Sequence, residues 1–369
     1  MTTWKKYKWG DIASLEYGKS IRDFRTSSGK TPVYGTNGPI GFTTEVLCPF
    51  PSIIIGRKGA YRGVHYSPTP FFVIDTAFYL KPKASYINLK FCYYNLLLQD
   101  INGLDSGSAI PSTRREDFYG LEINLPDVPT QTRIASILSS LDDKIELNRR
   151  MNQTLEQMAK ALFNHYFVDN IDKDNLPEGW RWGNYSDLVK IWSGKGLKKD
   201  EFIEMGTYPI YGANGVIGKT NRYLVDKKLL LTGRVGTLGT VQIVQDKIWI
   251  SDNVLVSEPY FNYNFYFSKF ILNSFDFIGL NRGSTQPLIT QTDLKSQVVL
   301  IPSSKALTHF NKIVSSYYEI IFSNKKENLK LTQIKDTLLP KLMSGEIDVS
   351  DLNEEKLIEN YATENILNA

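Results

Sequence analysis

The feature that most constrains this chain of 369 residues is an internal repeat. Residues 32–41 (PVYGTNGPIG) reappear 177 positions later as residues 209–218 (PIYGANGVIG). The same offset relates Gly56-Arg-Lys-Gly to Gly233-Arg-Val-Gly, and after one deletion an offset of 176 relates residues 103–111 to residues 279–287. Chance does not hold one register over so long a stretch. The chain is therefore a tandem duplication, and its fold must be built twice.

The first part of each copy, residues 1–126 and 177–302, is rich in glycine, aromatic residues and short apolar runs such as Ser52-Ile-Ile-Ile. Short strands separated by glycine turns are predicted for both parts. One helix is predicted in each, near residues 89–100 and 264–275. The fold class is therefore α+β, with two similar domains that each combine a mixed β-sheet with helices.

The second part of each copy, residues 127–176 and 303–347, changes character. Its apolar residues recur in steps of three and four, which is the pattern of a long helix with a heptad seam. Asparagine falls at the same two seam positions in both copies: Asn148, Asn152, Asn324 and Asn328. A polar seam residue fixes register, so these asparagines are predicted to lock one helix, about 50 Å long, against the other. Two unrelated amphipathic helices on separate cores are the alternative. A polar tail follows over residues 348–369.

Charge follows the same boundaries. Residues 1–126 carry 15 basic and 10 acidic side chains, residues 177–302 carry 14 and 11, and both helical segments are slightly acidic. Two basic bodies suggest paired binding to a polyanion, although such an imbalance also serves solubility alone. Two cysteines and three histidines exclude a disulfide scaffold and leave little for metal binding or histidine-based catalysis. We expect a non-catalytic protein of the reducing cytoplasm, without a membrane span or a metal site.

One string resembles a nuclease motif. Pro126-Asp127 followed by Asp142-Asp143-Lys144 matches an acidic residue and a D-x-K sequence, but Asp142 lies inside the heptad run, whereas such metal sites need a strand. Gly18-Lys19-Ser20 lacks the upstream glycine of a phosphate-binding Walker loop. The sequence therefore predicts no catalytic residues.

The doubled YGxNGxIG motif, the GRxG turn and the C-terminal stretch LLPKLMSGEI (residues 338–347) together resemble the specificity subunit of type I restriction-modification systems. The resemblance covers nearly the whole chain. It implies two target-recognition domains, each reading half of a split DNA sequence, held apart by the two long helices as an antiparallel coiled coil with pseudo-twofold symmetry. The end of the first helix (KALFNHYF) departs from the end of the second (KDTLLPKL), which puts equivalent docking at the two ends in doubt.

The repeated motifs supply the candidate DNA-binding residues. Asn-Gly is a hairpin signal, so the first motif is a structural turn or a turn that also reaches DNA. The arginines of GRxG can bind phosphate or guanine, or they pair with Asp75 and Asp252 as structural ion pairs. The two glycine- and proline-containing loops of residues 107–115 and 283–291 carry side chains that can contact phosphate or base edges. The candidates are Lys19, Tyr34, Asn37, Arg57, Lys58, Tyr61, Arg62, Ser108, Arg114 and Arg115 in the first copy, and Lys195, Lys198, Tyr211, Asn214, Arg234, Thr237, Arg282, Ser284 and Gln286 in the second.

The resulting hypothesis is a subunit that recognises double-stranded DNA at a bipartite, asymmetric target with an unread spacer. By resemblance, its partners are two methyltransferase subunits together with restriction/translocase subunits. Those partners, and not this chain, are expected to use S-adenosylmethionine, ATP and Mg²⁺. The alternative is a protein–protein scaffold that binds DNA only weakly.

Overall fold

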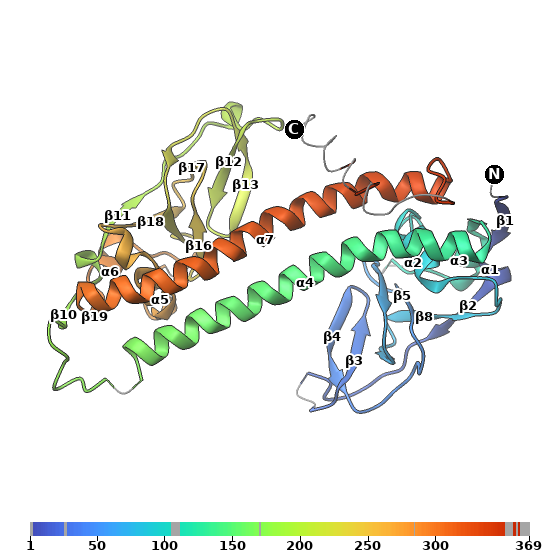
Figure 1. The fold of residues 1–369 in the computed structure, drawn as a ribbon, viewed down its shortest axis with the longest axis horizontal. Helices are drawn as coiled ribbons and strands as arrows, with labels where there is room; N and C mark the ends of the chain where they lie inside the picture. The colour runs from blue at the N-terminus through green and yellow to red at the C-terminus, as the bar shows by residue number, and fades with distance from the viewer. Residues whose placement is uncertain are drawn as a thin grey trace. The chain divides into compact units, whose positions relative to one another are not determined.

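The structure is a computed structural model that describes residues 3–25, 28–104, 111–169, 171–283, 285–350, 357–358 and 361. The chain divides into two compact units (Figure 1). Unit 1 comprises residues 1–148 and 325–369, and unit 2 comprises residues 149–324. Each unit contains one α+β body and part of each long helix, so the units cut across the order of the sequence.

Unit 1 is built from a four-stranded sheet, a three-stranded sheet and a two-stranded ribbon. The strand orders are β2-β8-β5-β6, β4-β3-β7 and β1-β9. All pairs are antiparallel except β3 with β7. The elements are β1 (Lys5–Lys8), α1 (Trp9–Ile12), β2 (Ala13–Tyr17), β3 (Thr31–Gly35), β4 (Gly38–Thr43), β5 (Ser52–Gly56), β6 (Val64–Ser67), β7 (Phe72–Val73), β8 (Ala77–Pro82), α2 (Leu89–Leu97), α3 (Arg115–Gly120) and β9 (Glu122–Leu125).

Unit 2 repeats this topology. Its strand orders are β11-β18-β15-β16, β13-β12-β17-β14 and β10-β19, with one additional edge strand, β14. The predicted duplication and the two predicted helices, α2 and α5, are confirmed. The elements are β10 (Arg181–Asn184), η1 (Tyr185–Asp187), β11 (Val189–Ser193), η2 (Lys199–Glu201), β12 (Tyr208–Gly212), β13 (Gly215–Thr220), β14 (Val225–Asp226), β15 (Leu229–Gly233), β16 (Val241–Val244), β17 (Lys247–Ile250), β18 (Val254–Pro259), η3 (Asn262–Asn264), α5 (Phe265–Ser274), α6 (Gln291–Lys295) and β19 (Val298–Ile301).

The long helices are α4 (Val128–Phe167) and α7 (Ser304–Ser344), and within each unit they run antiparallel. In unit 1, Asn148 Nδ2 donates to Asn328 Oδ1 (2.9 Å) and to Glu327 Oε2 (2.7 Å). In unit 2, Asn324 Nδ2 donates to Asn152 Oδ1 (2.9 Å). The four seam asparagines therefore pair across the two helices, as the heptad register predicts.

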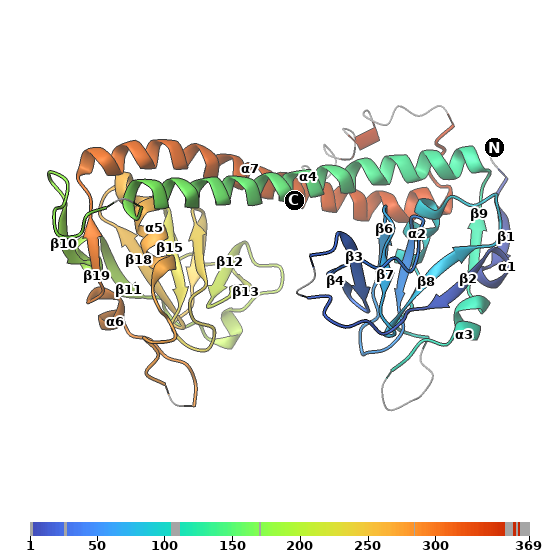
Figure 2. The same ribbon diagram turned by 90° about the horizontal axis from the view of Figure 1, so that it is seen from below.

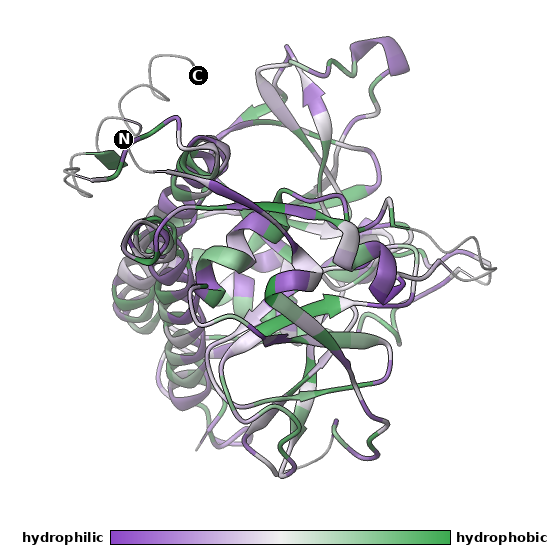
Figure 3. Cartoon of the chain, turned by 90° about the vertical axis from the view of Figure 1, so that its right-hand side faces the viewer, coloured by the Kyte–Doolittle hydropathy of each residue, from purple (hydrophilic) through white to green (hydrophobic). Residues whose placement is uncertain are grey.

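The helices also complete the cores of the two bodies. In unit 1, Leu138 and Leu342 are fully buried in the same apolar cluster as Phe78 of the sheet. In unit 2, Phe163 of α4 stacks on Phe270 of α5 with ring centroids 5.1 Å apart. Hydrophobic and hydrophilic residues accordingly alternate around both helices (Figure 3). Each body therefore shares its core with the long helices.

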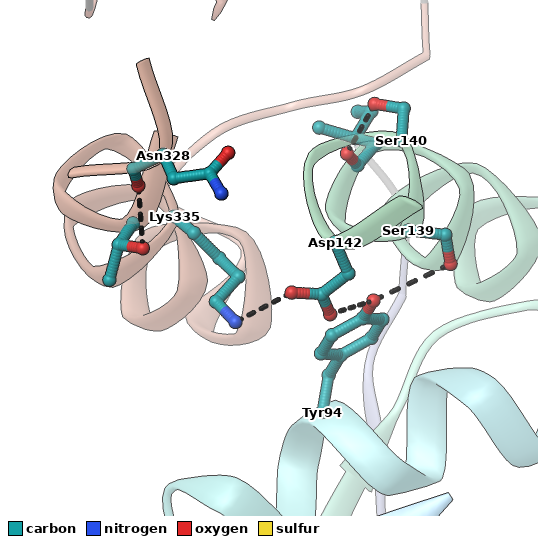
Figure 4. Close-up of polar contacts among 8 residues, drawn as sticks. Tyr94, Ser139, Ser140, Asp142, Asn328 and Lys335 are labelled. Atoms are coloured by element: carbon teal, nitrogen blue, oxygen red, sulfur yellow. Dashed lines mark hydrogen bonds and ion pairs between the residues drawn. The ribbon is translucent and has the colours of Figure 1, made fainter. Parts of the chain in front are cut away.

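Asp142 has a structural partner on each side (Figure 4). Its Oδ1 accepts from Lys335 Nζ (2.7 Å), and its Oδ2 accepts from the Tyr94 hydroxyl (2.8 Å). The carboxylate of the nuclease-like string thus joins α4 to α7 and α2. No group of three metal-binding side chains occurs in the part of the chain that the structure describes.

The segment after α7 is not purely polar in its packing. Val349 is 2% exposed and Leu357 is 8% exposed, and both belong to the core of unit 1. Arg133 Nη1 donates to the Ser350 carbonyl (2.8 Å). The predicted polar tail therefore begins with residues that anchor it. Across the described residues, no helix is long and apolar enough to cross a membrane.

Candidate nucleic-acid interface

In each unit, loops meet at one edge of the four-stranded sheet, away from the long helices (Figure 2). The ladder places them together: Tyr17 at the end of β2 pairs with Phe78, and Gly56 at the end of β5 pairs with Ala77. Gly18 N then donates to Ala77 O (3.1 Å). A Cβ on Gly18 would collide with the Ile74 carbonyl, so glycine allows the chain to turn closely over the sheet edge. In unit 2, Gly194 lies equally close to the backbone carbonyls of the neighbouring strand end.

Backbone hydrogen bonds tie the GRxG loop to the proline-containing loop. In unit 1, Gly59 N donates to Pro111 O (2.9 Å) and Thr113 N donates to Arg57 O (3.0 Å). In unit 2, the equivalent bonds are Gly236 N to Pro287 O (3.0 Å) and Ile289 N to Arg234 O (2.9 Å). The same loop frame is therefore built twice, although most side chains on it differ.

The Asn-Gly motifs form the predicted hairpin turns. Gly38 and Gly215 have φ of +114° and +117°, which a residue with a Cβ rarely adopts. Asn37 and Asn214 are exposed in these turns. Tyr34 is different: it is 9% exposed and packs edge-on against Phe71, with ring centroids 5.7 Å apart. The prediction that Tyr34 contacts DNA is therefore wrong, because its ring belongs to the core. Tyr211 is half-buried against the equivalent cluster.

Arg62 also needs correction. Its side chain is 2% exposed, and its guanidinium donates to the carbonyls of Gly59 (2.9 Å) and Asn102 (2.6 Å). These carbonyls belong to two different loops. Arg62 therefore holds the loops together and leaves the set of DNA contacts.

Arg57 stays at the surface of the interface. Its Nη1 donates to the backbone carbonyl of Asp75 (3.1 Å), and its guanidinium lies 4.8 Å from the centroid of the Tyr17 ring. Among the described residues, no ion pair joins Arg57 to the Asp75 carboxylate or Arg234 to that of Asp252. The structural ion-pair alternative is therefore wrong, and neither arginine is neutralised by the aspartate proposed for it.

Tyr17 is a residue that the sequence analysis missed. It is 48% exposed, and the Arg115 guanidinium lies 3.8 Å from its ring centroid. Arg57 shares this ring, so two guanidinium groups gather around one exposed tyrosine. The available signal was an aromatic residue directly before Gly18-Lys19, at the predicted end of a strand.

Two further arginines have carboxylate partners at this edge. Arg114 Nε lies 3.2 Å from Asp117 Oδ2, and Arg282 Nη2 lies 2.5 Å from Asp293 Oδ1. Burial of the Asp293 carboxylate opposes ionisation, but hydrogen bonds from Thr290 and Arg282 outweigh it and lower its pKa. Arg282 is still 67% exposed, so its outer N–H groups can reach a ligand.

The remaining candidates fall into two groups. Ser108 and Ser284 lie outside the residues that the structure describes. The exposed candidates on the interface loops are Lys19, Lys58, Tyr61, Lys195, Lys198, Thr237 and Gln286. Each unit therefore presents several cations and polar side chains beside its paired loops.

Comparison with known proteins identifies this arrangement. The family model described as type I restriction modification DNA specificity domain matches residues 1–157 and 177–333. The MjaIX specificity subunit of Methanocaldococcus jannaschii is 26% identical over 294 residues, covering 69% of this chain and 66% of the relative, just under two thirds of its length. The HindI specificity subunit of Haemophilus influenzae is 24% identical over 377 residues, covering 75% of this chain and 81% of the relative.

A solved structure shares the fold. The crystal structure of a type I restriction-modification S subunit from M. genitalium superposes with a TM-score of 0.70 at 22% identity, over 92% of this chain and 96% of that chain. The chain belongs to the family of type I restriction-modification specificity subunits, the non-catalytic components of these complexes. DNA target recognition is the function that this membership implies.

Proposed function

We propose that the chain recognises a bipartite, asymmetric target in double-stranded DNA, with an unread spacer between the half-sites. The observation that carries the proposal is the loop frame built twice with the same backbone hydrogen bonds and different side chains. A common frame can present itself to DNA in the same way in both units. Different side chains on it then favour different bases, because base edges in the major groove differ in donors and acceptors.

The spacer follows from the long helices. Each helix contributes residues to both units, and the asparagine pairs fix one register. We propose that the length of the helix pair sets the distance between half-sites, as dimer geometry does in other DNA-binding proteins. The same helices and the core-anchored C-terminal segment are the proposed docking region for two methyltransferase subunits and for restriction subunits. Those partners would bring S-adenosylmethionine, ATP and Mg²⁺ in the cytoplasm.

Domain exchange tests the bipartite reading. Residues 1–126 are replaced by the equivalent part of another specificity subunit, and the complex is assembled with its methyltransferase subunits. Methylated adenines are then mapped by single-molecule sequencing. We expect one half of the target to change and the other half to stay. Changes in both halves contradict modular recognition, and DNA binding without sequence selectivity favours the scaffold alternative.

Helix length tests the spacer. Residues 149–155 of α4 and the opposing residues 321–327 of α7 are deleted together, which removes one heptad, about 10 Å of helix, and keeps the Asn148–Asn328 pair. We expect a shorter spacer or no binding. The same target bound with the same affinity would show that the helices do not set the distance.

A further inference from the structure

At one pair of equivalent positions, the two interfaces have side chains of different chemistry. In unit 1 these are Tyr17 at the end of β2 and Arg115 at the start of α3. In unit 2 they are Ser193 at the end of β11 and Gln291 at the start of α6. The repeat offset of 176 relates both pairs, and the strands that carry Tyr17 and Ser193 have the same register with their neighbours. The difference is therefore one of side chains on a conserved frame.

In unit 1, no polar side-chain contact of the Arg115 guanidinium occurs among the residues that the structure describes. Arg115 is half-buried, and its Nε is inaccessible and has no hydrogen-bond partner. Across the described residues, its only side-chain interactions are with the rings of Tyr17 (3.8 Å) and Phe78 (6.0 Å). Stacking on a ring holds the guanidinium plane and leaves its outer N–H groups free to donate as a fork. The base edge that matches such a fork is guanine, through O6 and N7.

In unit 2 both side chains are neutral, and the Gln291 amide is hydrogen-bonded through its nitrogen and through its oxygen. Gln291 Nε2 donates to Ser193 Oγ (3.0 Å), and Gln291 Oε1 accepts from Lys295 Nζ (3.3 Å). An amide has two N–H donors and two acceptor lone pairs, so one of each remains available. The base edge that matches an amide of fixed orientation is adenine, through N6 and N7.

The two GRxG arginines do not explain a difference between the half-sites. Arg57 and Arg234 are the same residue type at equivalent positions, and their backbone bonds are the same. Shared cations suit phosphate contacts, which position a protein on the duplex without reading sequence. Base discrimination must then come from positions where the copies differ.

We propose that residues 115 and 291 are specificity-determining positions: Arg115 reads a guanine in one half-site, and Gln291 reads an adenine in the other. Tyr17 and Ser193 are positioning residues that orient these two side chains. This inference rests on the proposed function, because it names the bases that each unit recognises at one position.

Exchange of the pairs between units tests the inference. The full chain is assembled with its methyltransferase subunits, and binding to a library of randomised duplexes is measured at one salt concentration. In Y17S/R115Q, we expect one position of the first half-site to change from guanine to adenine. In Q291R, with or without S193Y, we expect one position of the second half-site to change from adenine to guanine. A bidentate base contact corresponds to roughly 5- to 150-fold discrimination at that position.

Controls separate base reading from other roles. K6Q removes a positive charge from β1, where Lys6 pairs with Glu122, and should leave every base preference unchanged. Y17F keeps the ring under Arg115 and should preserve the guanine preference. If Y17S/R115Q loses its cooperative thermal unfolding, Q291R alone decides the question.

Two results would overturn the inference and leave the proposed function standing. One is an equal loss of affinity for all sequences, which marks a phosphate contact. The other is intact binding with unchanged preference at every position. Wild-type complex that binds all duplexes equally would instead overturn the proposed function itself.

Discussion

Removal of the Asp142 carboxylate should destabilise unit 1 strongly. Asp142 accepts from Lys335 on α7 and from Tyr94 on α2, so Asp142→Asn removes the counter-charge of one donor and at least one good acceptor (Figure 4). Burial raises the pKa of the Tyr94 hydroxyl, which therefore remains a donor at neutral pH and loses a charged acceptor in this variant.

The magnitude follows from the exposure of the pair. The Lys335 and Asp142 side chains are 20% and 29% exposed. Breaking a fully buried ion pair costs about 3–5 kcal/mol, whereas an exposed pair contributes about 0–1 kcal/mol. A pair that is mostly but not fully buried lies between these limits. We expect D142N to lower the free energy of unfolding by about 2–3 kcal/mol.

Urea unfolding provides the assay, and the neighbouring residue provides the control. Asp143 is exposed on the same turn of α4. Its replacement in D143N changes the same charge and should alter the free energy of unfolding by less than about 0.5 kcal/mol. The combination with K335M measures the coupling between the two side chains. If D142N and D143N unfold at the same urea concentration, the bridge between α4, α7 and α2 does not stabilise the unit as argued.

Three further predictions concern pH, the helix seam and the interface. Burial lowers the pKa of Lys228 to about 8. Between pH 8 and its ordinary pKa of 10.5, the unfolded chain keeps a proton on this lysine that the folded chain releases. The free energy of unfolding of the wild type should therefore rise with pH over this range, and that of K228M should rise less. Urea titration at each pH measures both. Asn152→Leu leaves the Asn324 amide without its acceptor. This single variant should therefore melt at a lower temperature than the N152L/N324L double variant, as measured by circular dichroism. The reverse order would show that the amide pair does not bond across the helices. Lys58→Gln should reduce the slope of log affinity for DNA against log salt concentration by about 0.9, because Lys58 is exposed. R62M should leave this slope unchanged and instead lower the urea midpoint of unfolding, because Arg62 is buried.

Much of the fold could be predicted from the sequence, because it depends on patterns that recur along the chain. The duplication, the helices α4 and α7, and the asparagine pairs all rest on periodicity and register. The hairpin turns rest on Asn-Gly, whose glycine has positive φ in both copies. The sharing of the core between helices and bodies was not predicted, since a heptad pattern does not show which surface covers a flanking residue such as Phe163.

The interface was harder to predict because exposure depends on contacts between residues far apart in the sequence. Arg62 looks like a phosphate ligand in a basic loop, yet its buried guanidinium donates to one carbonyl of its own loop and to one of a second loop. Tyr34 lies in a repeated motif, yet its ring packs on Phe71. The stacking of Arg115 on Tyr17 joins the end of one strand to the start of a later helix, and no local pattern announces such a pair.

These contacts also fit the proposal that the two copies of the fold recognise different DNA sequences. The bonds that shape the paired loops, such as Gly59 N to Pro111 O, run between backbone atoms and do not depend on the neighbouring side chains. Buried side chains such as Arg62 and Tyr34 stabilise the loops of unit 1 from the core side. Residues 115 and 291 can therefore differ while the loop frame stays the same. Under the proposed function, this separation of frame residues from DNA-facing residues would allow the two copies to diverge in the bases that they recognise without losing their fold.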